Sequence, residues 1–222
     1  MEQKGVLFDM DGVLVDSGPI HREAWKRLAR EAGRPMEDSF FDRVFGMRNE
    51  EILEELLGPG LDRERKAALG KRKEEIYRAL ARERLAPAPG AAELVAALEK
   101  AGFRLALASS GPRANVELML DVTGLGREME TYVSAEDVER GKPDPQVFLE
   151  AARRLALPPG RCVVVEDAAV GVRAARRAGM KVVGVAAGGD REVLREADLV
   201  VSSLEELSPR VFEELLEVPW ET

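Results

Sequence analysis

The stretch VLFDMDGVLVDS, residues 6–17, decides the fold of this chain and raises the question of its function. It begins as an apolar run of the kind that forms a buried strand, and it stops at two aspartates, Asp9 and Asp11, with one residue between them. Two like charges about 4 Å apart cost about 4 kcal/mol at an effective dielectric constant near 20. The pair therefore predicts that something at the strand end offsets the repulsion.

Five more apolar runs follow, and helical patterns lie between most of them. Most of these runs are continuous rather than alternating, which is typical of strands that are covered on both faces. Strands that alternate with helices predict an α/β fold with a doubly wound, mainly parallel, Rossmann-like sheet. The predicted strands cover residues 5–10, 103–109, 131–135, 161–167, 181–186 and 198–201.

The interval from residue 15 to residue 87 breaks this alternation. It contains helical patterns and no convincing strand, and the helical text is followed by APAPG, residues 86–90, as a returning linker. The interval is far longer than an ordinary connection between two strands. We therefore predict two domains, an α/β core of residues 1–14 and 88–222 and an inserted α-helical cap domain of residues 15–87.

The net charge, the cysteine content and the length of the apolar stretches indicate which partners and which compartment to expect. A net charge of −8 over 222 residues makes nucleic acid and anionic membranes unexpected partners. The single cysteine, Cys162, is expected to be a buried apolar residue in a reducing compartment. The chain enters a strand at once, and no apolar stretch reaches the roughly 18 residues of a membrane span. We expect a cytoplasmic protein and, by default, a monomer.

Polar side chains follow the carboxyl ends of four predicted strands, the edge at which open α/β sheets bind their ligands. Each residue alone has an ordinary explanation, such as a turn or a helix cap, so the argument depends on the set. In strand order the residues are Asp9 and Asp11, Ser109 and Ser110, Lys142, and Glu166 and Asp167.

These residue types suit a metal ion and a phosphate. Converging carboxylates require a cation, and oxygen ligands favour Mg²⁺, whereas one histidine and one cysteine disfavour zinc. A lysine and a serine supply donors for phosphate oxygens. One aspartate can then attack phosphorus while the other exchanges a proton. A calcium loop starting at Asp9 is excluded, because its twelfth position is Ile20 and not glutamate.

Four segments together resemble the motifs of the haloacid dehalogenase-like hydrolase superfamily, in order and with its spacing. They are FDMDGVLVDS (8–17), LALASSGPR (105–113), GKPDPQVF (141–148) and VVVEDAAVGVRAARRAGM (163–180). The resemblance covers nearly the whole chain, including the inserted helical cap. It implies that Asp9 is the nucleophile and that Asp11 is the general acid and base.

The resemblance also implies roles for the other polar residues. The transferring phosphoryl group would be bound by Ser109, Ser110 and Lys142. Mg²⁺ would be bound by Asp9, Asp11, Glu166 and Asp167, with Asp11 contributing its backbone carbonyl and Glu166 acting directly or through a neighbour. The dehalogenases of the superfamily lack the second aspartate, because a halide needs no proton, so its presence favours a phosphate ester as substrate.

The segment DSGPIHREAWKRLAREAG, residues 16–33, resembles the β-phosphoglucomutase branch, in which cap residues contact the sugar. His21 and Trp25 are four residues apart and share one helix face, and Lys73 is similar to a cap lysine of those mutases. Taken alone, Trp25 is expected to belong to the core of the cap rather than to contact the sugar. Asn49 stands where the mutases carry an arginine for a second phosphate, and its lack of charge favours a phosphatase.

We therefore expect a Mg²⁺-dependent phosphatase that hydrolyses a small phosphorylated metabolite, a sugar or polyol phosphate, through an aspartyl-phosphate. Two alternatives stay open: a β-phosphoglucomutase, and a metabolite-binding protein on the same fold without catalysis. Release of phosphate, transfer to another hydroxyl, or binding without turnover would distinguish the three.

Overall fold

The protein is described here from a computed structural model, of which residues 3–44, 47, 49–187 and 189–218 are described. The contacts between residues divide the chain into two compact units. Unit 1 comprises Met1–Asp16 and Ala86–Thr222, and unit 2 comprises Ser17–Leu85.

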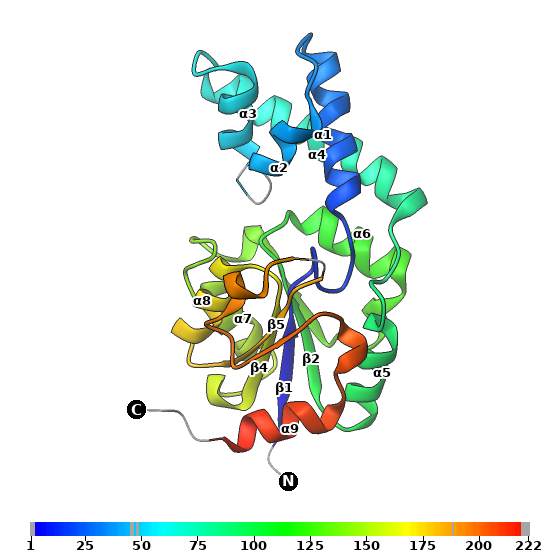
Figure 1. Ribbon diagram of the computed structural model, residues 1–222, viewed down its shortest axis with the longest axis vertical. Coiled ribbons are helices and arrows are strands. Elements are labelled where there is room, and N and C mark those ends of the chain that lie inside the picture. Colours follow the sequence, from blue (N-terminus) through cyan, green and yellow to red (C-terminus); the bar gives the residue numbers. More distant parts are fainter. Residues whose placement is uncertain (1–2, 45–46, 48, 188, 219–222) are drawn as a thin grey trace. The chain divides into compact units, whose positions relative to one another are not determined.

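Unit 1 is built on a six-stranded sheet with the order β3-β2-β1-β4-β5-β6, in which each pair of neighbours is parallel (Figure 1). The strands are β1 (Gly5–Phe8), β2 (Arg104–Ala108), β3 (Thr131–Val133), β4 (Cys162–Glu166), β5 (Lys181–Val185) and β6 (Leu199–Val201). The strand order runs outward in opposite directions from β1, so the carboxyl end of β1 is a topological switch point. The predicted α/β fold is confirmed.

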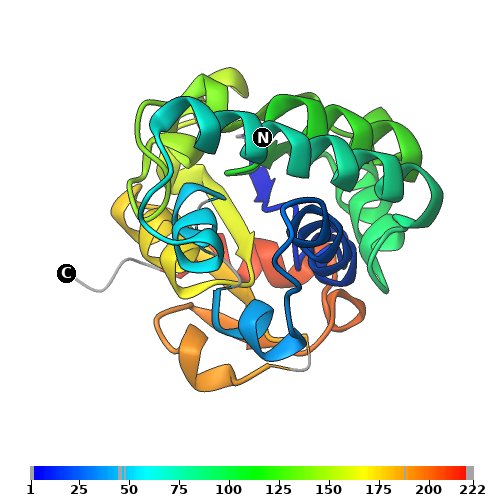
Figure 2. The same cartoon turned by 90° about the horizontal axis from the view of Figure 1, so that it is seen from above.

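Helices cover both faces of this sheet (Figures 1 and 2). One face packs against α7 (Gln146–Arg154) and α8 (Ala169–Arg177), and the other packs against α5 (Ala91–Lys100) and α9 (Pro209–Glu217). A further helix, α6 (Arg113–Thr123), connects β2 to β3. Because both faces are covered, all residues of β1, β4 and β5 are buried, which accounts for their continuous apolar sequences.

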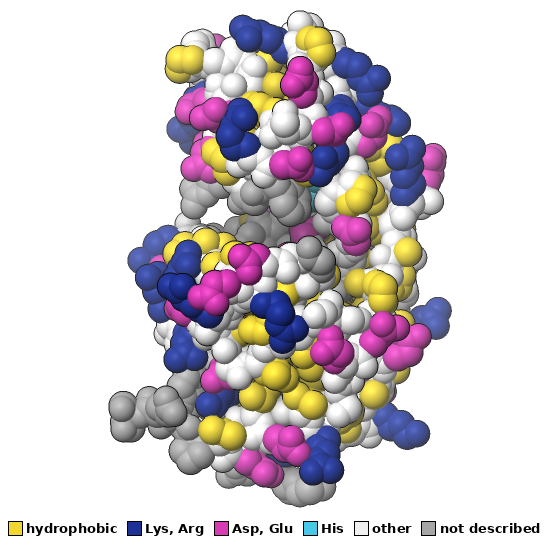
Figure 3. Space-filling model, viewed as in Figure 1, with side chains coloured by type: hydrophobic (Ala, Val, Ile, Leu, Met, Phe, Trp, Pro, Cys, Tyr) yellow, Lys and Arg dark blue, Asp and Glu magenta, His cyan; other side chains and the backbone are white. Residues whose placement is uncertain are grey.

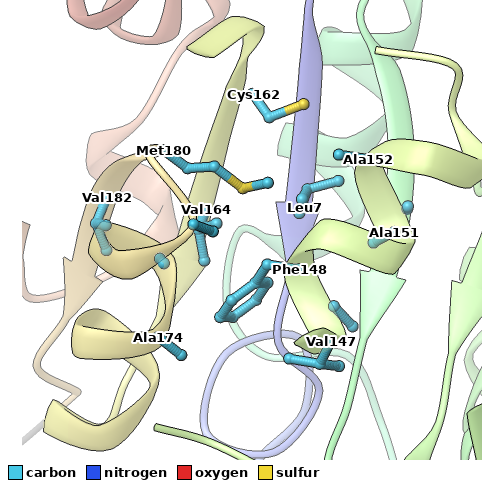
Figure 4. Packing of buried hydrophobic residues seen from close by; sticks show 14 of the residues in the cluster. Leu7, Val147, Phe148, Ala151, Ala152, Cys162, Val164, Ala174, Met180 and Val182 are labelled. Carbon is cyan, nitrogen blue, oxygen red and sulfur yellow. The ribbon is translucent and has the colours of Figure 1, made fainter. Parts of the chain in front are cut away.

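Buried apolar side chains fill the space between the sheet and helices α7 and α8 (Figure 4). Phe148 of α7 points toward Leu7 of β1 and Val164 of β4 in this cluster. Full burial of such a side chain contributes about 1.5–3 kcal/mol. Cys162 is a free, fully buried cysteine in the same cluster, as predicted, and burial raises the pKa of its thiol to about 12.

Unit 2 is helical. Its helices are α1 (Gly18–Glu31), α2 (Asp38–Val44), α3 (Asn49–Leu57) and α4 (Arg63–Arg84). Helix α4 begins after Asp62, whose carboxylate accepts a hydrogen bond from the Arg65 amide and thereby caps the helix. Helices α1 and α4 pack against each other, and both Trp25 and Tyr77 are buried.

The surface carries charges of both signs, interspersed over the face in Figure 3, and the net charge is −8. Within the described residues, every helix is too short or too polar to cross a lipid bilayer.

The two segments that join unit 1 to unit 2 are paired with each other. Val15 forms β-bridges with Asp11 and with Pro87. The amide of Ala88 also donates to the carbonyl of Leu14 at 2.8 Å. The chain therefore leaves the sheet and returns to it at one place.

Candidate active site

The ladder of the sheet continues one residue beyond two of its strands. The Asp9 amide donates to the Val165 carbonyl at 3.0 Å, and the Ser109 amide donates to the Val133 carbonyl at 2.9 Å. The backbone amide of each residue is therefore hydrogen-bonded as in a strand, although each residue follows its strand. This places Asp9 and Ser109 at the carboxyl edge of the sheet.

A tight turn follows Asp9 and places the second aspartate. The Gly12 amide donates to the Val15 carbonyl at 2.8 Å, and Gly12 has a φ of +78°, a conformation that favours glycine. A Cβ atom at this position would also overlap the carboxylate of Asp167. Gly12 thus lets the first motif approach Asp167 closely.

Lys142 lies at the centre of the acidic residues. Its ammonium is 2.5 Å from Asp9 Oδ1, 2.6 Å from Glu166 Oε1 and 3.3 Å from the Ala108 carbonyl oxygen, so its three protons have three acceptors. Burial opposes the charge of Lys142, but Asp9 and Glu166 outweigh burial and raise its pKa above the ordinary lysine value. Lys142 is therefore a fixed positive charge.

Glu166 is held at both carboxylate oxygens. Oε1 accepts from Lys142, and Oε2 accepts from the Ala168 amide at 2.9 Å. The side chain is 1% exposed, and it fits because Gly171 lacks a Cβ, which would overlap the carboxylate. Each oxygen of Glu166 thus accepts a hydrogen bond, one from Lys142 and one from the backbone of Ala168.

The site holds more negative charge than Lys142 balances. Burial raises the pKa of Asp9 to about 7, with Lys142 opposing the shift and Glu166 and Asp11 adding to it. Burial also raises the pKa of Asp167 to about 8, and the charges of Asp9 and Glu166 add to that shift. A bound cation would reverse these shifts, because it favours the charged carboxylates.

The donor set fits a divalent metal ion. One carboxylate oxygen each from Asp9, Glu166 and Asp167 lies within 4.8 Å of the others. Oxygen atoms at such separations suit a hard cation. The acidic cluster is therefore suited to a divalent metal.

The remaining predicted residues of unit 1 differ in their surroundings. Ser109 is buried, and its Oγ accepts from the Gly111 amide at 2.9 Å, so it does not cap a helix. Ser110, next to it, is exposed, and Asp11 is half-buried. The structure thus brings Asp9, Lys142, Glu166 and Asp167 together.

The predicted residues of unit 2 form a cluster of their own around Lys73, whose ammonium is 2.8 Å from His21 Nδ1 and 2.9 Å from Glu74 Oε1. Asn49 donates to the same Glu74 oxygen at 2.8 Å. The ammonium also lies 5.4 Å from the centre of the Trp25 ring, a cation–π distance. The structure brings all four predicted residues together through Glu74 and Lys73. The neighbouring Arg48 lies outside the described residues.

Several residues of these clusters are missed by reading the sequence alone. Gly12 and Gly171 provide space for carboxylates, Glu74 joins Lys73 to Asn49, and Tyr77 stacks on His21 with ring centres 4.0 Å apart. The two glycines stand inside the quoted motifs, which is a usable signal. Glu74 has none, because charged residues surround it along the helix.

The four motifs and their geometry agree with a comparison against known families. The sequence matches the haloacid dehalogenase-like hydrolase family over residues 3–179. The chain belongs to this family.

A phosphatase and two β-phosphoglucomutases resemble the chain over nearly its full length. Hexitol phosphatase A of Escherichia coli is 38% identical over 208 residues, which cover 94% of each chain. The β-phosphoglucomutase of Bacillus subtilis is 34% identical over 98% of this chain and 96% of its own. A crystal structure of β-phosphoglucomutase from Clostridium difficile superposes with a TM-score of 0.84 at 27% identity, covering 97% of both chains.

Proposed function

We propose that this chain is a Mg²⁺-dependent phosphatase that hydrolyses a sugar phosphate or polyol phosphate. The observation that carries the proposal is the position of Lys142 between Asp9 and Glu166, with Asp167 beside them. This arrangement orients one carboxylate as a nucleophile and provides positive charge for a phosphoryl group. The similarity to a hexitol phosphatase supports the substrate class.

The reaction takes place in two steps. In the first, an oxygen of Asp9 forms a bond to phosphorus, the bond from phosphorus to the alcohol oxygen breaks, and Asp11 gives its proton to that oxygen. In the second, Asp11 takes a proton from a water molecule that attacks phosphorus. The bond between Asp9 and phosphorus then breaks, and inorganic phosphate leaves.

Lys142 and Ser109 hold the phosphoryl group during these steps, with Ser110 beside them. Lys142 directs one proton at Asp9 Oδ1 and thereby fixes the orientation of the nucleophile. Ser109 accepts the Gly111 amide through its oxygen and keeps its own proton for a phosphate oxygen.

Mg²⁺ would be held by carboxylate oxygens of Asp9 and Asp167, by the backbone carbonyl of Asp11, and by Glu166 directly or through water. When bound, the ion supplies positive charge to the phosphoryl oxygens. The closely grouped carboxylates and the raised pKa values of Asp9 and Asp167 support this assignment.

We further propose that unit 2 recognises the alcohol part of the substrate through His21, Trp25, Asn49 and Lys73. The Lys73 ammonium donates to His21 Nδ1, so that nitrogen is an acceptor and Nε2 carries the proton. The imidazole and the amide can bind hydroxyl groups, and the ammonium lies over the Trp25 ring.

A β-phosphoglucomutase is the second candidate, and the resemblance to the Bacillus subtilis enzyme favours it. Such a mutase has to hold a bisphosphate. The Asn49 amide, however, carries no charge and donates to Glu74, an anion. This contact favours a substrate with a single phosphate.

Phosphate release across a panel of sugar and polyol phosphates, with Mg²⁺ and then with a chelator, tests the proposal. We expect release that requires the metal, and we expect Asp11→Asn to reduce turnover of poor leaving groups most. Absence of release from every compound would refute the phosphatase. Conversion of β-glucose 1-phosphate to glucose 6-phosphate faster than phosphate release would establish the mutase.

A further inference from the structure

The segment that carries Lys142 has no regular secondary structure from residue 138 to residue 145. The lysine side chain is itself flexible, with four carbons between its backbone and its ammonium. Nevertheless the ammonium contacts carboxylates from two different strands, Asp9 after β1 and Glu166 of β4. Other contacts must therefore hold the loop.

Gln146, the first residue of α7, is hydrogen-bonded to the part of the loop that precedes Lys142. Its side-chain oxygen accepts the amides of both Glu139 and Arg140, each at 3.0 Å. We call these two hydrogen bonds the grip. The backbone amide of Gln146 also donates to Asp144 Oδ1 at 3.1 Å, which closes the turn after the lysine. One side chain thus ties the beginning of the loop to its end.

The position of Gln146 is fixed by its neighbours in α7. The next two residues, Val147 and Phe148, are 1% and 0% exposed and belong to the hydrophobic cluster between the sheet and helices α7 and α8. The ring of Phe148 lies 5.0 Å from the Lys142 ammonium. A second hold comes from α8, where the Arg177 guanidinium donates to the Pro143 carbonyl at 3.1 Å.

We propose that Gln146 is a positioning residue for Lys142. By holding the backbone at Glu139 and Arg140, it keeps the ammonium in reach of Asp9 and Glu166 together. Gln146 acts through Lys142 and does not touch the phosphoryl group. This inference rests on the proposed function, in which Lys142 orients the nucleophile.

The acceptor oxygen of Gln146 distinguishes a positioning role from a general effect of this residue on stability. Both loop amides bind the side-chain oxygen, and a glutamate at this position keeps such an oxygen. A carboxylate is also favourable in the first turn of a helix. Gln146→Glu therefore retains the grip, whereas Gln146→Ala removes it.

The first experiment compares kcat and KM of the two variants on the best substrate of the panel. A misplacement of about 1 Å can cost about 100-fold in rate. For Gln146→Ala we expect kcat to fall about 10- to 100-fold with KM changed less than about threefold, and Gln146→Glu to stay within about threefold of wild type. Arg153→Ala, on the same helix with a side chain 71% exposed, is the matched control and should leave kcat unchanged.

A double-mutant cycle tests whether the effect passes through Lys142. With Lys142→Ala as background, Gln146→Ala should have little further effect on residual turnover of an activated aryl phosphate, because the group that it positions is absent. Equal fold-losses in both backgrounds would overturn the proposal. So would equal losses in Gln146→Ala and Gln146→Glu.

Hydrogen exchange tests whether Gln146 holds the loop backbone, and it requires no measurement of enzyme activity. The amides of Glu139 and Arg140 should exchange faster in Gln146→Ala and remain protected in Gln146→Glu. Unchanged exchange in Gln146→Ala would refute the grip. If the wild type hydrolysed nothing while the exchange followed expectation, the proposed function and the catalytic role of Gln146 would fail, and the grip would stand as structure alone.

Discussion

Lys142 in unit 1 and Lys73 in unit 2 are both nearly enclosed, with side chains 7% and 3% exposed, but their surroundings differ in charge. Lys142 contacts two carboxylates, and a third, Asp167, lies beside them. Among the described residues, Lys73 contacts the carboxylate of Glu74 and the imidazole of His21. Three carboxylates thus gather at Lys142, whereas the described contacts of Lys73 pair its ammonium with the carboxylate of Glu74.

The two lysines therefore differ in the charge of their surroundings, and this difference bears on what could bind at each place. Burial of unbalanced carboxylates raises the pKa values of Asp9 and Asp167, which is unfavourable for the fold alone. A divalent metal ion would offset that excess of negative charge. The pair of Lys73 and Glu74 instead brings one positive and one negative side chain together, and both residues are buried.

The largest effect is expected at the nucleophile. Asp9→Asn should lower phosphate release by at least about 10⁴-fold, because an amide does not form the covalent intermediate. Circular dichroism and thermal melting would establish that the variant is folded. Asp121→Asn, an exposed aspartate of α6, is the matched control. A loss of less than tenfold in Asp9→Asn would remove Asp9 from the reaction.

The next largest effect is expected at the buried ion pair of Lys73 and Glu74. Glu74→Gln should destabilise the protein by about 3 kcal/mol, because it removes a buried carboxylate that contacts the enclosed Lys73 ammonium. Urea unfolding would measure the loss, which Mg²⁺ should not restore. The exposed Glu75→Gln, one residue along α4, is the control. Equal stability of both variants would show that Lys73 does not depend on Glu74.

A new charge in unit 2 should change specificity. Asn49→Arg replaces an amide by a cation and should increase affinity for sugar bisphosphates about tenfold, a gain of about 1.4 kcal/mol. Inhibition of monophosphate hydrolysis by a bisphosphate would measure this affinity, and mutase-like transfer should rise with it. An unchanged inhibition constant would contradict the role given to Asn49.

The smallest effect is a pH dependence of the metal-free protein. Asp9 and Asp167 have folded pKa values of about 7 and about 8, raised from 3.8, so the fold favours their protonated forms. Their contribution to stability is therefore present below pH 4 and is lost as pH rises through 7 to 8. Because water reaches the half-buried Asp167, we expect a loss of only about 1 kcal/mol between pH 6 and 9.

The pH dependence of stability can also be measured with the metal ion added. Urea unfolding with a chelator and with Mg²⁺ should give curves that diverge as pH rises, because the ion binds the deprotonated carboxylates. Asp167→Asn should abolish the divergence and stabilise the metal-free protein at pH 9. Parallel curves for the wild type would contradict a metal site at these residues.

The sheet was predictable because its strands are continuous apolar runs. The observed strands lie within the predicted ranges and are shorter, as at β1, which ends at Phe8 where residue 10 was predicted. Asp9 still extends the ladder through its amide, but the chain then turns at Gly12. Polar residues at several strand ends were predicted to converge because parallel strands share one edge.

Contacts that depend on the direction of a side chain were not predictable. Gln146 reads as an ordinary first residue of a helix, and its hold on Glu139 and Arg140 follows only from the path of the loop. Glu74 is one of many acidic residues in α4, and only the fold places it between Lys73 and Asn49. Periodicity identifies the face of a helix but not the partner of a charged group.

The pairing of Val15 with Pro87, and of Leu14 with Ala88, has an evolutionary meaning. Because the inserted segment starts and finishes at adjacent points, a recombination event could exchange it for another segment with matching ends and leave the strand register intact. Substrate preference could then diversify by replacement of this module, while the machinery for breaking the phosphate ester is inherited unchanged.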